Sequence, residues 1–325
     1  MKILTILIFS GDRFHVNGLL KDITRINQKN LDIRLVDWTE NKEILKKKKK
    51  IYTYYQKKLN NFKIFYQKGS YEFKYSKFIT KFKSKYILLI SDDDRLCSNN
   101  FPKIFKYLKF DFSGITMSFN NFENYKDLKK KYYDGDGSVR EFNIYKDINR
   151  IGFISCQIIK TNLIQKIYKK EKNNLLITQF PQNFIILRII REFQKWKVLN
   201  LNCIFNRVGN LELYTKNPKK YLDRLKSEYR GYLIPIKNNF KHLKKNEIKE
   251  IYKIIFSKNI ISWLFLSIKY FGKIKTFKDI KEVRKIIDEP YIIKLTLIIF
   301  YISPIFFLNF IRIIRKNFNK VINNK

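Results

Sequence analysis

The stretch Tyr86–Leu96 reads Tyr-Ile-Leu-Leu-Ile-Ser-Asp-Asp-Asp-Arg-Leu, an apolar run that stops at three adjacent carboxylates. The run has the length and β-branched content of a buried strand. The carboxylates of Asp92, Asp93 and Asp94 repel one another, and a divalent cation relieves such repulsion. Mg²⁺ and Mn²⁺ take hard oxygen ligands from one or two carboxylates and from substrate phosphates. Because open α/β sheets bind ligands at the carboxyl ends of their strands, the stretch predicts a site for a metal and a diphosphate.

Strand and helix patterns alternate ahead of this stretch. We expect strands at Ile3–Ser10, Leu31–Trp38, Phe62–Tyr66 and Tyr86–Ile90, with helices between them at Val16–Ile26, Lys42–Leu59 and Phe73–Phe82. That order predicts a doubly wound, mostly parallel α/β sheet. The second strand ends in Asp37, which would face the same crevice as the acidic triplet. A solvated acidic turn is the alternative for an isolated triplet, and the strand in front of it favours the site.

The pattern is looser after Phe101. We expect strands at Phe112–Phe119 and Val198–Phe205, a strand or strand-turn at Ile151–Ile159, helices at Asn162–Lys170 and Phe184–Phe193, and a polar loop over Asn120–Asn143. After Pro218 the segments become long, basic and helical. The sequence therefore predicts a first domain over residues 1–215 and a basic helical region over residues 216–325.

The composition is strongly basic. Lys and Arg number 68 against 28 Asp and Glu, which gives a formal net charge of +40 over 325 residues. Such a chain is attracted to polyanions, whether nucleic acid, nucleotide phosphates or an anionic membrane surface. The three cysteines lie far apart and only two histidines are present, so neither a zinc site nor a disulfide framework is visible. The apolar N-terminus lacks a cleavage site and is interpreted as a strand, which places the protein on the cytoplasmic side.

The segment Ile292–Ile314 is the most apolar of the chain. No charge occurs between Lys294 and Arg312, and Pro304 interrupts the segment. A spanning helix needs about 17–25 apolar residues, so this segment is at the lower limit. Basic flanks suit a membrane interface, whereas a buried core helix is the alternative. We expect a peripheral or shallowly inserted attachment to the inner face of the plasma membrane, helped by anionic lipid.

The chain resembles a family 2 glycosyltransferase with the GT-A fold, of the bacterial surface-polysaccharide type, over about Ile3–Asn210. The resemblance rests on Arg13 shortly after the first strand, Asp37 at the end of the second, the motif Ser91–Leu96, and Arg207-Val-Gly-Asn210. It implies a metal-dependent, inverting transfer of a sugar from a nucleotide diphosphate sugar to the hydroxyl of a lipid-linked or polysaccharide acceptor.

The resemblance also implies roles for individual residues. Arg13, Asp37, Asp92 and Asp93 would bind the nucleotide sugar, with Asp37 on the base or ribose. Asp93 and Asp94 would hold Mg²⁺ or Mn²⁺. The family motif spaces its acids as Asp-x-Asp or Asp-x-Asp-Asp, and Ser91 stands here in place of the first acid.

The catalytic base does not follow the family pattern. Inverting members carry an acidic base in a stretch that corresponds to Leu175–Leu187, and no carboxylate occurs there in this chain. Glu171 is the nearest acid, and Asp134 and Asp136 lie in a glycine-containing loop. Glu171 and Asp136 are therefore the candidates, and the base stays open.

Two other functions remain open. A nucleic-acid-binding protein would explain the charge and the interleaved lysines and aromatics of Lys46–Lys58, but not an acidic triplet at a strand end. A membrane-bound glycosyltransferase relic without catalysis would explain the missing base. Arg13, Arg95 and Arg207 are candidates to assist substrate phosphates, and an ordinary surface role is the alternative for each. We expect no specific nucleic acid partner.

Overall fold

The computed structural model describes residues 2–26, 29–69, 71–122, 128, 134–177, 180–207, 231–232 and 235–241, with a few residues between 243 and 251. The chain divides into two compact units, Met1–Leu211 with Arg230–Lys241, and Glu212–Tyr229 with His242–Lys325. The expected membrane segment Ile292–Ile314 lies outside the described residues, and the boundary expected near residue 215 stays a prediction. Among the described residues, no helix has the length and apolar character that crossing a membrane requires.

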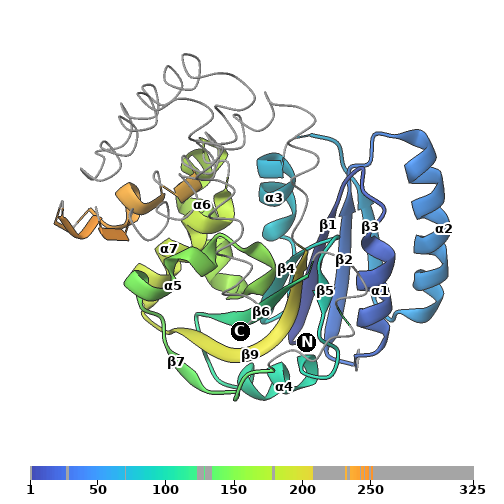
Figure 1. The fold of residues 1–325 in the computed structure, drawn as a ribbon. Coiled ribbons are helices and arrows are strands. Elements are labelled where there is room, and N and C mark those ends of the chain that lie inside the picture. The colour runs from blue at the N-terminus through green and yellow to red at the C-terminus, as the bar shows by residue number, and fades with distance from the viewer. Residues whose placement is uncertain are drawn as a thin grey trace, which may run out of the picture. The chain divides into compact units, whose positions relative to one another are not determined.

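The first unit begins with a regular alternation of strands and helices (Figure 1). Its elements are β1 Leu4–Ser10, α1 Val16–Thr24, β2 Leu31–Asp37, α2 Lys42–Lys58, β3 Phe62–Tyr66, α3 Tyr71–Ile79 and β4 Tyr86–Ser91. Every residue of β1 is buried, as expected for a central strand covered on both faces. Helices α1 and α2 pack on one face of this part of the sheet and α3 on the other. The expected α/β fold with a mostly parallel sheet is confirmed.

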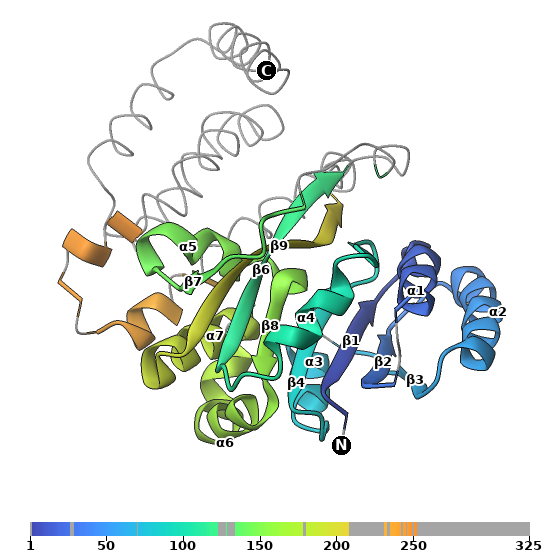
Figure 2. The ribbon, with the colours of Figure 1, turned by 90° about the horizontal axis from the view of Figure 1, so that it is seen from below.

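The later elements complete the sheet. They are β5 Arg95–Leu96, α4 Phe101–Tyr107, β6 Gly114–Phe122, β7 Val139–Glu141, α5 Ile144–Ile151, β8 Gln157–Lys160, α6 Thr161–Ile177, α7 Pro181–Phe193 and β9 Trp196–Arg207. The strand order is β3-β2-β1-β4-β8-β6-β9-β5, with β7 paired to β9. Strand β8 runs antiparallel to both of its neighbours, and β6 lies parallel to β9 (Figure 2). Most neighbouring strands therefore end at one common edge.

The stretch Ile151–Ile159, expected as a strand or strand-turn, forms a strand only in its last part. Helix α5 runs through Ile151, a short 3₁₀ turn follows at Ile154–Cys156, and β8 begins only at Gln157. The Asn143 side chain caps α5 by accepting a hydrogen bond from the Tyr145 backbone N–H at 2.9 Å. The capped amphipathic helix α5 thus reaches the first residue of this stretch, and the 3₁₀ turn takes up the residues just before β8.

Helix α1 is joined to β5 by a buried ion pair. Arg95 Nε and Nη2 donate to Asp22 Oδ2 and Oδ1 at 2.5 and 2.6 Å, and the Leu96 backbone N–H donates to Asp22 Oδ2 at 3.2 Å. Asp22 is only 3% exposed. This two-pronged contact holds the segment after the acidic triplet against α1, so Arg95 has a structural partner rather than an open guanidinium.

We predict that Asp22→Asn destabilises the protein by about 2–3 kcal/mol, because it leaves the Arg95 charge unpaired beside a buried amide. The matched control is Asp111→Asn, which removes an exposed partner of Lys160 and is expected to cost less than about 0.5 kcal/mol. Urea unfolding of the full chain followed by circular dichroism measures both. Equal losses in the two variants would contradict a special role for the Asp22 pair.

Candidate functional site

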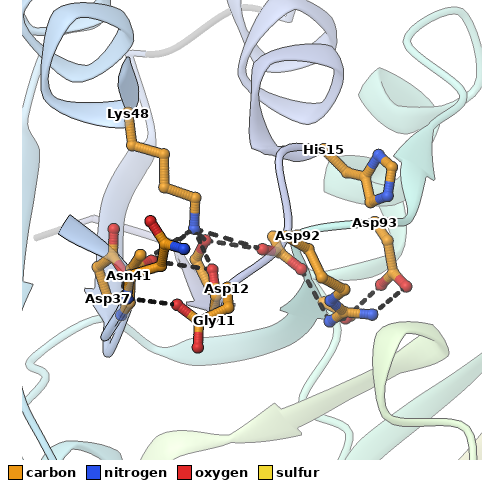
Figure 3. Close-up of polar contacts among 12 residues, drawn as sticks. Gly11, Asp12, His15, Asp37, Asn41, Lys48, Asp92 and Asp93 are labelled. Atoms are coloured by element: carbon orange, nitrogen blue, oxygen red, sulfur yellow. Dashed lines mark hydrogen bonds and ion pairs between the residues drawn. The ribbon is translucent and has the colours of Figure 1, made fainter. Parts of the chain in front are cut away.

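Three strand ends meet at one point of the sheet. In the parallel register Ser10 pairs with Asp37 and Phe9 pairs with Ser91, so β1, β2 and β4 all end at the same height. Asp92 is the first residue after β4, and its backbone N–H donates to the Phe9 carbonyl at 3.1 Å. The polar residues that follow these strands are thus placed side by side by the strand pairing itself (Figure 3).

A buried lysine lies at the centre of these strand ends. Lys48 of α2 is 0% exposed, and its Nζ donates to Ser10 Oγ at 2.7 Å, to Thr39 Oγ1 at 2.9 Å and to the Gly11 carbonyl. The same nitrogen is 3.9 Å from Asp37 Oδ1 and 4.0 Å from Asp92 Oδ2 (Figure 3). Burial lowers the pKa of Lys48, and the two carboxylates oppose that shift. All three donors of an ammonium group are therefore used.

The surrounding loops are built to accept this lysine. A side chain on Gly11 would place its Cβ 2.8 Å from the Trp38 indole nitrogen, so glycine is required where the chain leaves β1. Asp12 Oδ1 accepts from the backbone N–H groups of Glu40 and Asn41 at 2.9 and 3.0 Å, which joins the loop after β1 to the loop after β2. The Asn41 side chain then caps α2 and fixes where that helix starts.

Asp37 is buried at the end of β2 and fully engaged by the protein. Its Oδ1 accepts from the Thr39 backbone N–H at 2.7 Å and from Thr39 Oγ1 at 2.6 Å, and its Oδ2 accepts from the Tyr52 hydroxyl at 2.5 Å. Burial and the nearby charge of Asp37 raise the pKa of Tyr52, so the phenol keeps its proton and remains a donor. The expected nucleoside contact of Asp37 stays a prediction.

Asp92 and Asp93 share one arginine. The Arg13 guanidinium is 2.8 Å from Asp92 Oδ1, pairs with Asp93 Oδ2, and donates to Ser91 Oγ at 3.2 Å. Asp92 Oδ2 accepts from Ser10 Oγ at 2.7 Å, and Asp93 Oδ1 accepts from Ser91 Oγ at 2.5 Å. The structure thus brings together Arg13 and the first two acids of the triplet, with about a third of the Arg13 side chain still exposed, and their expected role in nucleotide-sugar binding stays a prediction.

Asp94 is directed toward different partners. Its Oδ1 accepts from the Arg207 backbone N–H at 3.0 Å, and its Oδ2 accepts from Ser155 Oγ. Burial raises the pKa of Asp94 to about 7, and the charge of Asp93 adds to the shift. The Arg207 side chain contacts the His15 ring, whose own pKa is lowered by burial and by that arginine. The end of β9 is therefore part of the site.

The chemistry of the donor set fits a divalent cation. Arg13 already spans Asp92 and Asp93, so these carboxylates face a point at which positive charge is favourable. Five of the six carboxylate oxygens of the triplet accept a hydrogen bond from described residues, whereas Asp92 Oδ1 has only the ion pair with Arg13. Within the described residues, no group of three or more His, Cys, Asp or Glu side chains is placed to hold a metal. Because Arg13 pairs with Asp93, a cation at Asp93 would have to displace that guanidinium.

The two candidate bases, Glu171 and Asp136, make their described contacts with residues other than Arg13 and the acidic triplet. Glu171 is on α6, where it pairs with Arg188 of α7 at 3.0 Å. Asp136 precedes β7, and hydrogen bonds from Ser138 and Asn200 lower its pKa. Asn200 comes well before Arg207 in β9, roughly 20 Å away at the rise of an extended strand. Neither acid is shown to act as the base, and both stay predictions.

The first turn of α7 occupies the stretch in which the resemblance expects an acidic base. It carries Gln182 and Asn183, which are 3% and 0% exposed. The Asn183 Oδ1 has no hydrogen-bond partner among the described residues. An amide at this place cannot accept a proton from a hydroxyl near neutral pH.

Sequence reasoning missed several residues of the site, namely Lys48, Thr39, Tyr52, His15 and Ser155. The sequence does contain a pattern that indicates Lys48. Lys48, Tyr52, Tyr55 and Leu59 follow the helical spacing i, i+4, i+7 and i+11, and all four are buried. A lysine in register with the apolar face of a helix indicates a buried cation. The run of neighbouring lysines hid this pattern.

Comparisons with known proteins identify the fold. No family model matches the chain, and no curated protein matches its sequence. The crystal structure of S. aureus TarS 1-349 in complex with UDP has a TM-score of 0.52 at 12% identity, covering 84% of this chain and 82% of that chain. The mannosyltransferase PcManGT from Pyrobaculum calidifontis, in complex with GDP-Man and Mn²⁺, has a TM-score of 0.49 at 7% identity, covering 87% and 73%. The likeness to TarS shows a shared, GT-A-like fold and nothing about the substrate.

We predict that Asp93→Asn and Asp94→Asn each weaken binding of Mn²⁺ by about tenfold or more, because each removes a charged oxygen ligand from the triplet. Electron paramagnetic resonance titration of free Mn²⁺ measures the affinity directly. Asp12→Asn is the matched control, since that carboxylate bonds to backbone N–H groups of a neighbouring loop. Unchanged Mn²⁺ affinity in both test variants would contradict a metal site at the triplet.

Proposed function

We propose that this protein is a glycosyltransferase that moves a sugar from a nucleoside diphosphate sugar to an acceptor hydroxyl. The observation that carries the proposal is the acidic triplet at the carboxyl end of β4, joined to Arg13 and Lys48 at a common edge of the sheet. Ligands of open α/β sheets bind at this edge. The fold shared with TarS, which was crystallised with UDP, supports a donor of the UDP-sugar kind.

The donor would be held by residues at the carboxyl ends of β1, β2 and β4. Asp37 is proposed to face the nucleoside, and Arg13, Asp92 and Asp93 the sugar diphosphate. The exposed part of the Arg13 side chain makes it the cation best placed to move onto a phosphate. Arg207, which contacts His15 beside the triplet, is a second cation on the same side.

The reaction requires charge to be neutralised on the leaving diphosphate while the sugar carbon acquires oxocarbenium-ion character. Mg²⁺ or Mn²⁺ held by Asp93 and Asp94 would act there as a Lewis acid when bound. The residues of the chain supply the rest: Arg13 pairs with phosphate oxygens once released from Asp93, and the packed strand ends exclude water from the carboxylates. Inversion at the sugar carbon is part of the proposal.

The acceptor's proton needs a base. Glu171 and Asp136 are the proposed candidates. A second function, a nucleotide-sugar-binding relic without transfer activity, is favoured by one observation: Gln182 and Asn183 stand where the resemblance expects a carboxylate. Donor binding would be the same in the two cases, so transfer itself has to be measured.

The acceptor is proposed to be a lipid-linked or polysaccharide glycan at the inner face of a bacterial plasma membrane. Helix α2 presents exposed lysines at positions 42, 46, 47, 49, 50, 57 and 58. The side chain of Tyr54 is 51% exposed on the same helix. Lysines near an anionic bilayer contribute about 1 kcal/mol each, and tyrosine suits the interface. Together with the apolar segment Ile292–Ile314, this basic surface supports membrane attachment.

We predict that purified protein with Mn²⁺ is stabilised by at least one nucleoside diphosphate sugar and releases the nucleoside diphosphate when an acceptor is supplied. Bound ligand raises the unfolding temperature through mass action. A thermal-shift screen of UDP- and GDP-sugars, followed by nucleotide-release assays, tests both steps. Absence of any Mn²⁺-dependent shift across the screen would contradict the proposed function.

Two substitutions separate an enzyme from a relic. Glu171→Gln and Asp136→Asn are expected to leave donor affinity unchanged, and transfer should fall about 10²–10⁴-fold in whichever variant removes the base. A donor-binding protein that transfers no sugar to any acceptor tested would favour the relic.

We predict that a chain ended near Lys258 moves from the membrane fraction to the soluble fraction, because the apolar segment Ile292–Ile314 is lost. Flotation with vesicles of phosphatidylglycerol and phosphatidylcholine measures membrane binding. In the full chain, Lys46→Glu combined with Lys50→Glu should also weaken this binding. A full-length protein that stays soluble without detergent and ignores anionic vesicles would contradict the attachment. Tight RNA binding instead would favour the nucleic-acid alternative.

A further inference from the structure

Lys48 is a charged residue in a place where charge is costly. Its side chain has no exposed surface, and lysine is among the residues least often fully buried in proteins. A methionine at this position would fill similar volume without desolvating an ammonium group. The lysines on either side of it are exposed, so the requirement for a cation belongs to this one position.

The contacts of Lys48 form two matching hydrogen-bond relays. On one side Lys48 Nζ donates to Ser10 Oγ, which donates to Asp92 Oδ2, both at 2.7 Å. On the other side Nζ donates to Thr39 Oγ1 at 2.9 Å, which donates to Asp37 Oδ1 at 2.6 Å. Each hydroxyl accepts a hydrogen bond from the ammonium group and donates one to a carboxylate. One cation thus orients two carboxylates at the ends of different strands.

We infer that Lys48 is a positioning residue that couples the nucleoside side of the site, through Thr39 and Asp37, to the diphosphate side, through Ser10 and Asp92. This inference rests on the proposed function. It goes beyond it by making the two halves of donor recognition depend on a residue that touches no substrate.

The relays can be cut one at a time. Thr39→Val is close to isosteric and removes the hydroxyl that links Lys48 to Asp37, which also lies 2.9 Å from the Gly11 carbonyl. Ser10→Ala removes only the hydroxyl that links Lys48 to Asp92. Lys48→Met keeps the side-chain length and removes both relays at once. Lys47→Met is the matched control, because it removes an exposed lysine from the adjacent position of the same helix.

The experiment is isothermal titration of the full chain with UDP, with and without Mn²⁺. Thr39→Val should weaken UDP binding about tenfold in both conditions, since a hydrogen bond to a charged group is lost on the nucleoside side. Ser10→Ala should weaken it about tenfold only with Mn²⁺. Lys48→Met should weaken binding by at least the larger of these factors, and Lys47→Met by less than about twofold.

Double variants separate positioning from mere support of the fold. If both relays originate at Lys48, adding Thr39→Val or Ser10→Ala to Lys48→Met changes UDP affinity by less than about twofold. Should Lys48→Met fail to fold, the Ser10→Ala/Thr39→Val double variant decides: a loss of UDP affinity smaller than the product of the two single losses supports the coupling, and a loss equal to that product contradicts it.

Three results would overturn the inference. The first is UDP binding by Lys48→Met within about twofold of the unaltered chain, and the second is a full additional loss in the double variants. The third is an identical Mn²⁺ dependence of the two relay variants. If the unaltered chain is folded yet binds no nucleotide, the proposed function is overturned, and this inference with it. If the unaltered chain binds UDP and Lys48→Met binds it equally well, only the inference about Lys48 fails.

Discussion

A single buried ammonium group holds the ends of β1, β2 and β4 in one arrangement. Lys48 lies within 4.0 Å of carboxylates from two of these ends and bonds to Ser10 and Gly11 at the third. At an effective dielectric of about 20, unit charges 4 Å apart attract by about 4 kcal/mol, a sizeable part of which offsets desolvation of the ions. Two carboxylates beside one cation leave the group negative overall, and the Arg13 guanidinium on Asp92 reduces that excess.

The three side chains of the acidic triplet have different partners, because adjacent residues at the end of a strand project in different directions. Asp92 turns toward β1 and α2, Asp93 toward Arg13, and Asp94 toward Ser155 and the end of β9. Asp92 therefore belongs to the internal framework, and Asp93 is the member whose main partner is a movable, partly exposed side chain. This division explains how three consecutive acids are tolerated in a site where each is at most 5% exposed.

Local patterns in the sequence predict the first half of the fold well. Strand β3 was predicted residue for residue, and β1, β2, β4 and α2 within one or two residues at each end, because each is a strongly periodic segment bounded by polar turns. The short elements β5 and β7 carry no such signal, since two or three residues show no period, and β7 is wholly exposed. In the stretch Ile151–Ile159, expected as a strand or strand-turn, the strand begins only at Gln157 for a related reason: a short buried 3₁₀ turn has the same apolar content as a short buried strand.

The site divides in the same way. Arg13 and the triplet were predictable because each is recognised from residues adjacent to it in the sequence. The partners that hold them are distant in the sequence: Ser155 lies 61 residues from Asp94, and Lys48 lies 38 residues from Ser10. Such pairings depend on strand order and helix docking, which a linear pattern does not contain. In the half of the site built by β1, β2 and α2, Lys48 and Asp37 have all their polar atoms engaged by the protein. In the proposed reaction the proton acceptor would have to come from later segments, where Gln182 and Asn183 supply amides, so the proposed transfer would depend on elements outside the framework that Lys48 organises.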